Sequence, residues 1–228
     1  MKANGLSLAS GALIIFALNI LSAMVALLTS YYAYKVNRLV SSSLLWAISI
    51  GFMLLGLGLV VDAGTSLISG RTLVEITGRT AGESFSDRVL TLFASLTYLT
   101  VQMVAYLIMA IAYARATYGS RTSFTAPLAV AGSAIVSLYT FSILSYFVAL
   151  ILLGFVVFQG LLLRSGRVSR LSGMVLLGFV LIFAAHCVLL VSVLVLGSGL
   201  FLIGTGVQFL GFLSLLVFVL RSEVVGPA

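Results

Sequence analysis

The sequence predicts an all-α integral membrane protein, a seven-transmembrane-helix bundle with the N-terminus outside and the C-terminus in the cytoplasm. Three observations predict it. Of the 228 residues, 62% are hydrophobic and only 7% are charged, whereas soluble domains carry about a quarter charged residues. The apolar residues form runs of roughly 20 residues, the length that crosses a bilayer. The basic residues gather in alternate connections between those runs.

These runs occupy nearly the whole chain and therefore predict a single transmembrane domain over residues 1–228. The first run is longer than the apolar core of a secretory signal, and Lys35 and Arg38 follow it, so we interpret it as a retained first helix. The predicted spans are approximately 10–34, 40–62, 89–114, 124–141, 143–163, 172–195 and 198–220.

The fourth and fifth spans share an uncharged stretch from 124 to 163. As one helix it would reach about 60 Å, twice the hydrocarbon thickness, so we expect it to break around Tyr139 to Ser145. With seven spans, most basic residues fall on the cytoplasmic side, whereas six spans would place the cluster at 164–170 outside. The positive-inside rule therefore favours seven spans in the cell membrane.

The connections predict where the protein meets its surroundings. The polar segment 70–88 is expected to be the main extracellular feature, and the short Gly-Ser-Gly at 197–199 makes the last two helices antiparallel neighbours. The net charge of +7 is spread singly between apolar runs. It indicates contact with the lipid bilayer and its anionic headgroups at the cytoplasmic face, and no nucleic acid. We also expect protein partners or a homo-oligomer.

Two sequence correspondences predict a parallel internal repeat, in which the first three helices match the last three around a linker helix. Lys35-Val36-Asn37-Arg38-Leu39 resembles Arg167-Val168-Ser169-Arg170-Leu171. Gln102 and Arg115 have the same separation in the third span as Gln208 and Arg221 have in the seventh. The alternative explanation is that membrane helices reuse the same few residues.

This three-plus-one-plus-three layout is similar to that of sugar transporters of the SWEET type. The resemblance implies a solute pathway between the triplets, although the repeated helices here lack the prolines of that family. Microbial rhodopsins share the seven-helix layout but need a lysine in the seventh helix for the retinal Schiff base. The lysines of this chain are Lys2 and Lys35, so a retinal Schiff base is excluded.

Polar side chains within the spans are the candidate ligand-binding residues, because such groups are costly in hydrocarbon and face the bundle interior. They are predicted to meet at one level, either as interhelical hydrogen bonds that hold the bundle or as a ligand site. These residues are Asn19, Gln102, His186 and Gln208.

The same inventory predicts no catalytic residue, metal site or cofactor. His186 has only Cys187 beside it, and adjacent helical positions point in different directions. A serine protease resembling rhomboids would pair Ser133 with His186, but the residues around Ser133 and the N-outside topology do not match. Asp62 is expected at the interface, at the outer end of the second span.

Glycines recur within three of the spans and are expected to allow close helix contact. They are Gly51, Gly56, Gly58, Gly173, Gly178, Gly204, Gly206 and Gly211.

Together these features predict a non-enzymatic multi-pass membrane protein, either a sensor or receptor-like module or an accessory subunit of a membrane complex. The alternative is a small-solute transporter or channel with a mid-membrane polar site. The predicted repeat favours the alternative, whereas the lack of broken helices and of charged pathway residues favours the first interpretation.

Overall fold

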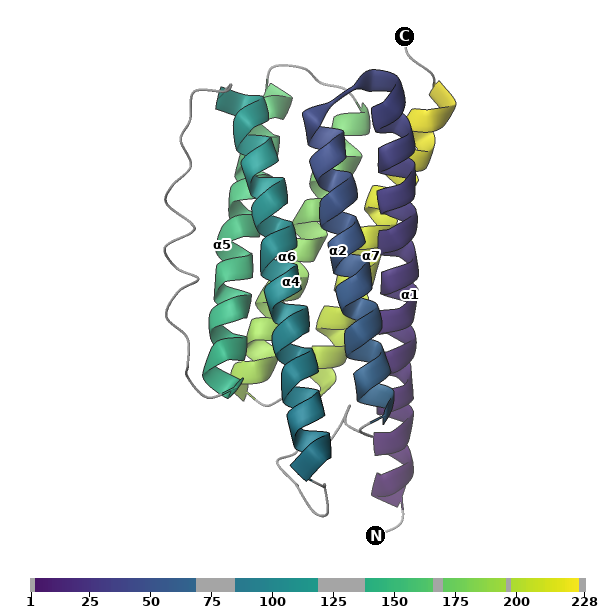
Figure 1. Cartoon of the computed structure of the whole chain (residues 1–228), viewed down its shortest axis with the longest axis vertical. Helices are drawn as coiled ribbons and strands as arrows, with labels where there is room; N and C mark the ends of the chain where they lie inside the picture. The colour runs from purple at the N-terminus through teal and green to yellow at the C-terminus, as the bar shows by residue number, and fades with distance from the viewer. Residues whose placement is uncertain (1–2, 69–84, 119–137, 166–169, 196–197, 226–228) are drawn as a thin grey trace.

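The computed structural model describes residues 3–68, 85–118, 138–165, 170–195 and 198–225, which form six α-helices and no strand. Each helix contains a segment long and apolar enough to cross a membrane. The prediction of an all-helical, multi-pass membrane protein is confirmed to this extent (Figure 1). The helices are α1 (Ala3–Val40), α2 (Ser43–Ile68), α4 (Phe85–Tyr118), α5 (Leu138–Ser165), α6 (Arg170–Val195) and α7 (Ser198–Val225).

Five of the predicted spans lie within these helices, and a sixth, 40–62, begins just before α2. The predicted fourth span, 124–141, falls mostly on 119–137, outside the described residues, as does most of the predicted extracellular segment 70–88. The break expected between Tyr139 and Ser145 is wrong, because α5 is continuous from Leu138. That stretch contains neither glycine nor proline, so nothing interrupts its intrahelical hydrogen bonds.

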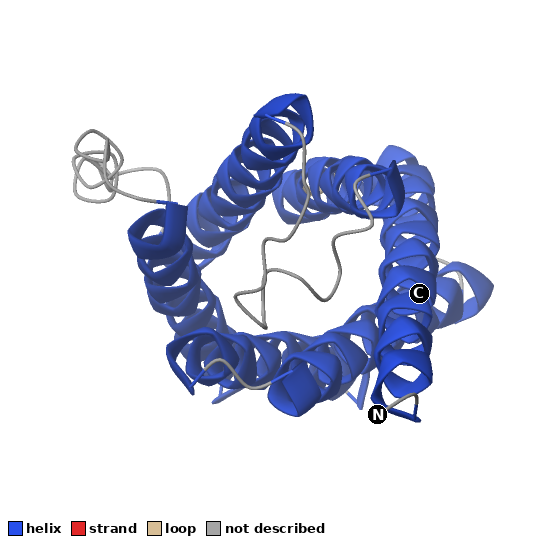
Figure 2. Cartoon of the chain, turned by 90° about the horizontal axis from the view of Figure 1, so that it is seen from below, coloured by secondary structure: helices blue, strands red, loops and turns tan. Residues whose placement is uncertain are grey.

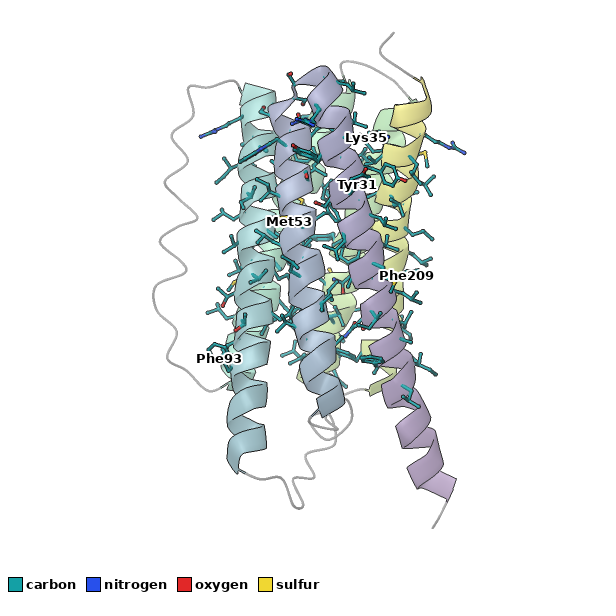
Figure 3. All side chains as sticks on the ribbon, turned by 45° about the vertical axis from the view of Figure 1, so that its right-hand side comes forward. Tyr31, Lys35, Met53, Phe93 and Phe209 are labelled. Atoms are coloured by element: carbon teal, nitrogen blue, oxygen red, sulfur yellow. The ribbon has the colours of Figure 1, made fainter. Side chains whose placement is uncertain are left out.

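The outward surface of the bundle is apolar, as a lipid-facing surface should be. Every helix exposes large hydrophobic side chains, and Figure 3 shows side chains projecting outward over the middle and upper parts of the bundle. A soluble bundle would place charged side chains on these faces. Examples, one from each helix in chain order, are Leu28, Met53, Phe93, Phe147, Leu177 and Leu210.

The six helices form a closed ring (Figure 2). Contacts link α1 to α2, α2 to α4, α4 to α5, α5 to α6, α6 to α7, and α7 back to α1. Two hydrogen bonds join α1 to α2. The Ser30 hydroxyl donates to the Ser49 carbonyl oxygen at 2.7 Å, and the Ser49 hydroxyl donates to the Ser30 carbonyl oxygen at 2.9 Å.

Helices α4 and α5 are parallel, although they are consecutive in the ring. The Tyr106 ring packs against His186 and the Tyr113 ring against Phe179, so α4 is antiparallel to α6. Tyr146 also packs against His186, and a Cβ on Gly160 would meet Leu176, so α5 is antiparallel to α6 as well. The end of α4 and the start of α5 therefore lie at opposite ends of the bundle (Figure 1).

Glycines allow close approach at the interfaces of α2 with α4 and of α6 with α7. A Cβ on Gly51 would lie 3.3 Å from the Ala105 carbonyl oxygen, and one on Gly211 would lie 3.1 Å from backbone atoms of Gly178 and Ile182. The prediction of close contact is wrong for Gly206, because a Cβ there would meet nothing within 4 Å.

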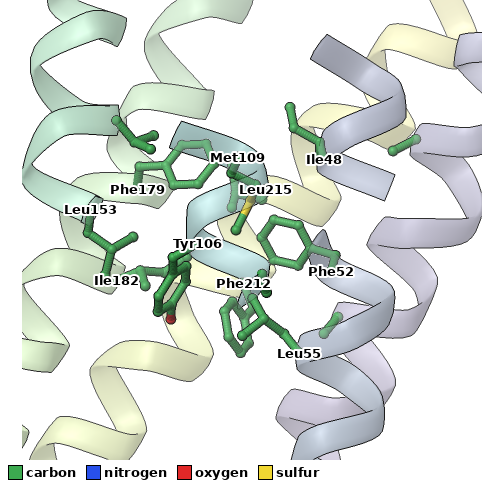
Figure 4. Close-up of a cluster of buried hydrophobic side chains, with 14 of the residues drawn as sticks. Ile48, Phe52, Leu55, Tyr106, Met109, Leu153, Phe179, Ile182, Phe212 and Leu215 are labelled. Atoms are coloured by element: carbon green, nitrogen blue, oxygen red, sulfur yellow. The ribbon is translucent and has the colours of Figure 1, made fainter. Parts of the chain in front are cut away.

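A cluster of buried hydrophobic side chains fills the half of the ring nearer the ends of α1, α4 and α7 (Figure 4). The Phe52 and Phe212 rings meet edge to face across it, with centroids 5.6 Å apart. Met109, Phe179 and Leu215 pack around them. We call this group the hydrophobic plug, because its side chains pack against one another across the interior of the ring.

Basic residues mark the same end of the bundle. Arg38 and Arg115 lie in the last turns of α1 and α4, and Arg221 lies just before the last turn of α7. Arg164 is next to the last residue of α5, and Arg170 begins α6. Because of the helix directions, all five belong to one end, which we call the basic end.

Candidate functional site

His186 on α6 lies at the centre of a buried polar group with side chains from α4 and α5. Its Nε2 is hydrogen-bonded to Gln102 Nε2 and lies 3.2 Å from the Tyr106 hydroxyl. The Tyr146 ring approaches the imidazole edge to face, with centroids 6.1 Å apart. We call these four residues the histidine cluster. His186 and Tyr106 have no exposed surface.

The hydrogen bonds fix the form of the imidazole. His186 Nδ1 lies 2.8 Å from the Ile182 carbonyl oxygen, which can only accept, so Nδ1 carries the proton. Nε2 is then the acceptor for the Gln102 amide and the Tyr106 hydroxyl. Both ring nitrogens of the neutral imidazole are engaged within the bundle.

A second polar group lies beside the first, with side chains from α1, α2, α4 and α7. Asn19 Nδ2 donates to Asp62 Oδ2 at 3.3 Å. Tyr98 on α4 lies close enough to Gln208 on α7 and to Asp62 on α2 for electrostatic interaction with both side chains. We call Asn19, Asp62, Tyr98 and Gln208 the aspartate cluster.

The aspartate cluster contains an unsatisfied donor. Gln208 is 5% exposed, and its Nε2 finds no acceptor among the described residues. A buried amide N–H without a partner costs about 1–3 kcal/mol. This donor therefore distinguishes Gln208 from Gln102, whose Nε2 is paired with His186.

The two clusters adjoin along one face of α4, because Tyr98, Gln102 and Tyr106 follow each other at intervals of four residues. Tyr98 is also close enough to Tyr106 and Tyr146 for electrostatic interaction. All six helices contribute to this polar layer, which lies beyond the hydrophobic plug as seen from the basic end. On α7, for example, Gln208 precedes Phe212 and Leu215 of the plug.

The four sequence-predicted residues are all buried, but they divide between the two clusters. Gln102 and His186 are in direct contact, whereas Asn19 pairs with Asp62 and Gln208 lies near Tyr98. Their role in binding a ligand stays a prediction.

Sequence reasoning missed the tyrosines and the inward direction of Asp62. Tyr98 and Tyr106 could have been found from their spacing of four residues on either side of Gln102. Asp62 does lie near the end of its candidate span, Ser43–Gly64, but its carboxylate points to Asn19. Tyr146 gives no such signal, because its helix contains several aromatic residues at similar positions.

The described residues contain no group of three or more histidine, cysteine or acidic side chains that could hold a metal ion. Cys187, next to His186, is partly exposed and free. Ser133 lies outside the described residues.

No family model, curated protein or solved structure matches this chain.

Proposed function

We propose that this chain is a non-enzymatic, receptor-like module of the cell membrane with seven spans. The observation that carries the proposal is the composition of the bundle interior, a polar layer closed on one side by the hydrophobic plug. A side chain layer of this kind can hold a small ligand, while the plug opposes a continuous water path. Ligand binding would change the packing of several helices at once, since all six contribute to the layer.

The direction of the helices supports the seventh span. α4 ends at Tyr118 and α5 begins at Leu138. Because these two helices are parallel, the two residues lie at opposite ends of the bundle. Tyr106 of α4 and Tyr146 of α5 both pack against His186, so they lie at about the same level. Counted from that level at about 1.5 Å per residue, Tyr118 and Leu138 lie about 30 Å apart along the bundle axis. This distance equals the hydrocarbon thickness, and residues 119–137 are just enough to cross it as a helix.

The charges support an N-terminus outside and a C-terminus in the cytoplasm. The basic end carries Arg38, Arg115 and Arg221 together with Arg164 and Arg170, and the positive-inside rule assigns such an end to the cytoplasm. The same side chains would contact anionic headgroups of the inner leaflet. The polar layer would then be reached from the outer side.

The geometry of His186 supports a role without catalysis. A general base needs a free lone pair within reach of a substrate proton, but the Nε2 lone pair is engaged by Gln102 and Tyr106. The histidine cluster holds α4 against α6 in this proposal.

The test combines purification with a flux assay. The chain is isolated from its native membrane by gentle solubilisation, and co-purifying proteins are identified by mass spectrometry. The purified chain is also reconstituted into vesicles, and entry of protons, potassium and radiolabelled glycerol is followed. We expect partner chains to co-purify and flux to match protein-free vesicles. A chain without partners that conducts any of these solutes would overturn the receptor proposal.

A transporter is the second candidate, and the two glycine interfaces favour it. Gly51 faces Met109 and the Ala105 carbonyl, and Gly178 faces Leu215 and the Gly211 carbonyl. Residues 109 and 105 of α4 correspond to 215 and 211 of α7 by the same offset that relates Gln102 to Gln208. This agreement supports a parallel repeat, an arrangement used by transporters. Flux that is lost in Gln208→Leu, in a variant that still folds, would establish this alternative.

A further inference from the structure

We propose that the bundle moves as two rigid triplets of helices, and that the hydrophobic plug separates when they move. The first triplet contains α1, α2 and α4, and the second contains α5, α6 and α7. This motion goes beyond the proposed function, since a receptor and a transporter would both be able to use it. Packing within each triplet differs in kind from packing between the two.

Within each triplet, neighbouring helices approach one another at their backbones. Every glycine of the described helices at which an added Cβ would meet another helix faces a helix of its own triplet. At four of these glycines the added Cβ would lie 3.1–3.3 Å from a backbone oxygen of the neighbouring helix, namely at Gly51, Gly56, Gly178 and Gly211. Close backbone contact of this kind holds membrane helices together. Each triplet therefore packs as one unit.

Side chains, in contrast, join the two triplets across the interior of the ring. In the plug, the Phe52 ring of α2 meets the Phe212 ring of α7 (Figure 4). The Tyr113 ring of α4 meets the Phe179 ring of α6. Both pairs are edge to face, with ring centroids 5.6 Å apart. Rigid-body motions in proteins occur about interfaces of this kind, at which packed side chains can rearrange while the units themselves stay intact.

The second triplet repeats the internal packing of the first. Gly178 and Phe179 on α6 take the places of Gly51 and Phe52 on α2. The buried residues between positions 22 and 36 of α1 recur with identical spacing between positions 145 and 159 of α5. Two units with the same packing can rotate against each other without rearrangement inside either, as parallel repeats do in transporters.

The histidine cluster also joins the triplets, because Gln102 and Tyr106 of α4 are hydrogen-bonded to His186 of α6. Separation there would leave buried donors and a buried acceptor unpaired, which is costly away from water. Two aromatic rings that separate leave no polar group unsatisfied. The plug is therefore the part that separates, and the motion opens the bundle toward the basic end.

Distances between spin labels on the full chain in lipid vesicles test this motion, measured by double electron–electron resonance. Cys187→Ser first removes the single cysteine. Labels on Tyr31→Cys and Leu161→Cys report the distance between the triplets, from α1 to α5. Tyr31→Cys with Ala116→Cys reports the first triplet, and Leu161→Cys with Leu220→Cys reports the second. All four side chains are exposed. We expect a broader distance distribution between the triplets than within either, and equal widths would overturn the proposal.

A looser plug should lengthen only the distance between the triplets. Phe212→Leu removes one ring of an aromatic pair, and we expect it to add a second, longer distance between the labels on α1 and α5. The matched control is Phe183→Leu, because this ring faces Gly154 within the second triplet and its loss should leave that distance unchanged.

Two results with these variants would overturn the proposal. One is an unchanged distance between the triplets in Phe212→Leu, and the other is an equal change in Phe212→Leu and Phe183→Leu. If Phe212→Leu fails to fold, the widths measured with the plug intact decide the matter by themselves.

Discussion

At the residue scale, the imidazole of His186 is the acceptor that joins α6 to α4. Membrane burial leaves its hydrogen bonds without competition from water, so the geometry of Gln102 and Tyr106 determines whether the ring is satisfied. Interhelical hydrogen bonds of this kind contribute about 0.6 kcal/mol on average in membranes. The value is larger where a truncation leaves a buried partner unsatisfied.

Gln102→Met should therefore lower the free energy of unfolding by about 1–3 kcal/mol, because it removes the closer donor to His186 and leaves Nε2 only the longer contact with Tyr106. Tyr106→Phe should cost less, about 0.6 kcal/mol, since Gln102 remains. The measurement is reversible unfolding in detergent micelles. The double variant should deviate from additivity, because both donors share one acceptor. Strictly additive losses would mean that the two side chains do not meet at the imidazole.

At the element scale, α7 approaches α6 closely at Gly204 and Gly211, whereas Gly206 faces open space. A Cβ on Gly211 would lie 3.1 Å from the Gly178 oxygen and 3.1 Å from the Ile182 nitrogen, which are backbone atoms. Neither can move aside as a flexible side chain does, so the helices themselves must separate. Gly206, on the same helix, has open space.

Gly211→Ala should lower the free energy of unfolding by about 1–3 kcal/mol, the usual cost of overpacking. The matched control is Gly206→Ala, which should be neutral or slightly stabilising because alanine is the better helix former. Chemical denaturation of the two variants in the same detergent provides the comparison. Equal stability of both would show that α6 and α7 can part here without cost.

The sequence was sufficient for six of the seven predicted helices and for the burial of Asn19, Gln102, His186 and Gln208, because hydropathy and the cost of polar groups in lipid act locally. It was not sufficient for their pairing. Which polar residue meets which depends on helix order around the ring and on rotation about each helix axis. The prediction of a helix break near Tyr139 was wrong for a related reason. The distribution of basic residues indicates how many spans there are, but it does not indicate at which residue a helix ends.

At the scale of the whole molecule, the parallel arrangement of α4 and α5 determines how often the chain crosses. Consecutive membrane helices joined by a short connection are antiparallel, because each crossing reverses the side. Parallel neighbours are expected where one additional crossing lies between them, as in the seven-span arrangement proposed above. Here Tyr118 and Leu138 are about 30 Å apart along the bundle axis, counted at the rise per residue of an α-helix. The number of residues between them is just sufficient for one helical crossing of the hydrocarbon.

Reporter fusions to truncated chains test this crossing directly. With Tyr118 in the cytoplasm, a fluorescent protein fused after it should fold and emit, and alkaline phosphatase should be inactive there. After Leu138 the two results should be reversed, because phosphatase needs the oxidising outer compartment for its disulfides. Fusions after Val40 and after Ile68 are the controls, since they report the inner and outer sides before the segment in question. The same reporter active after both Tyr118 and Leu138 would contradict the seventh span. It would also place the basic residues of α5 and α6 outside, against the charge bias that orients the bundle.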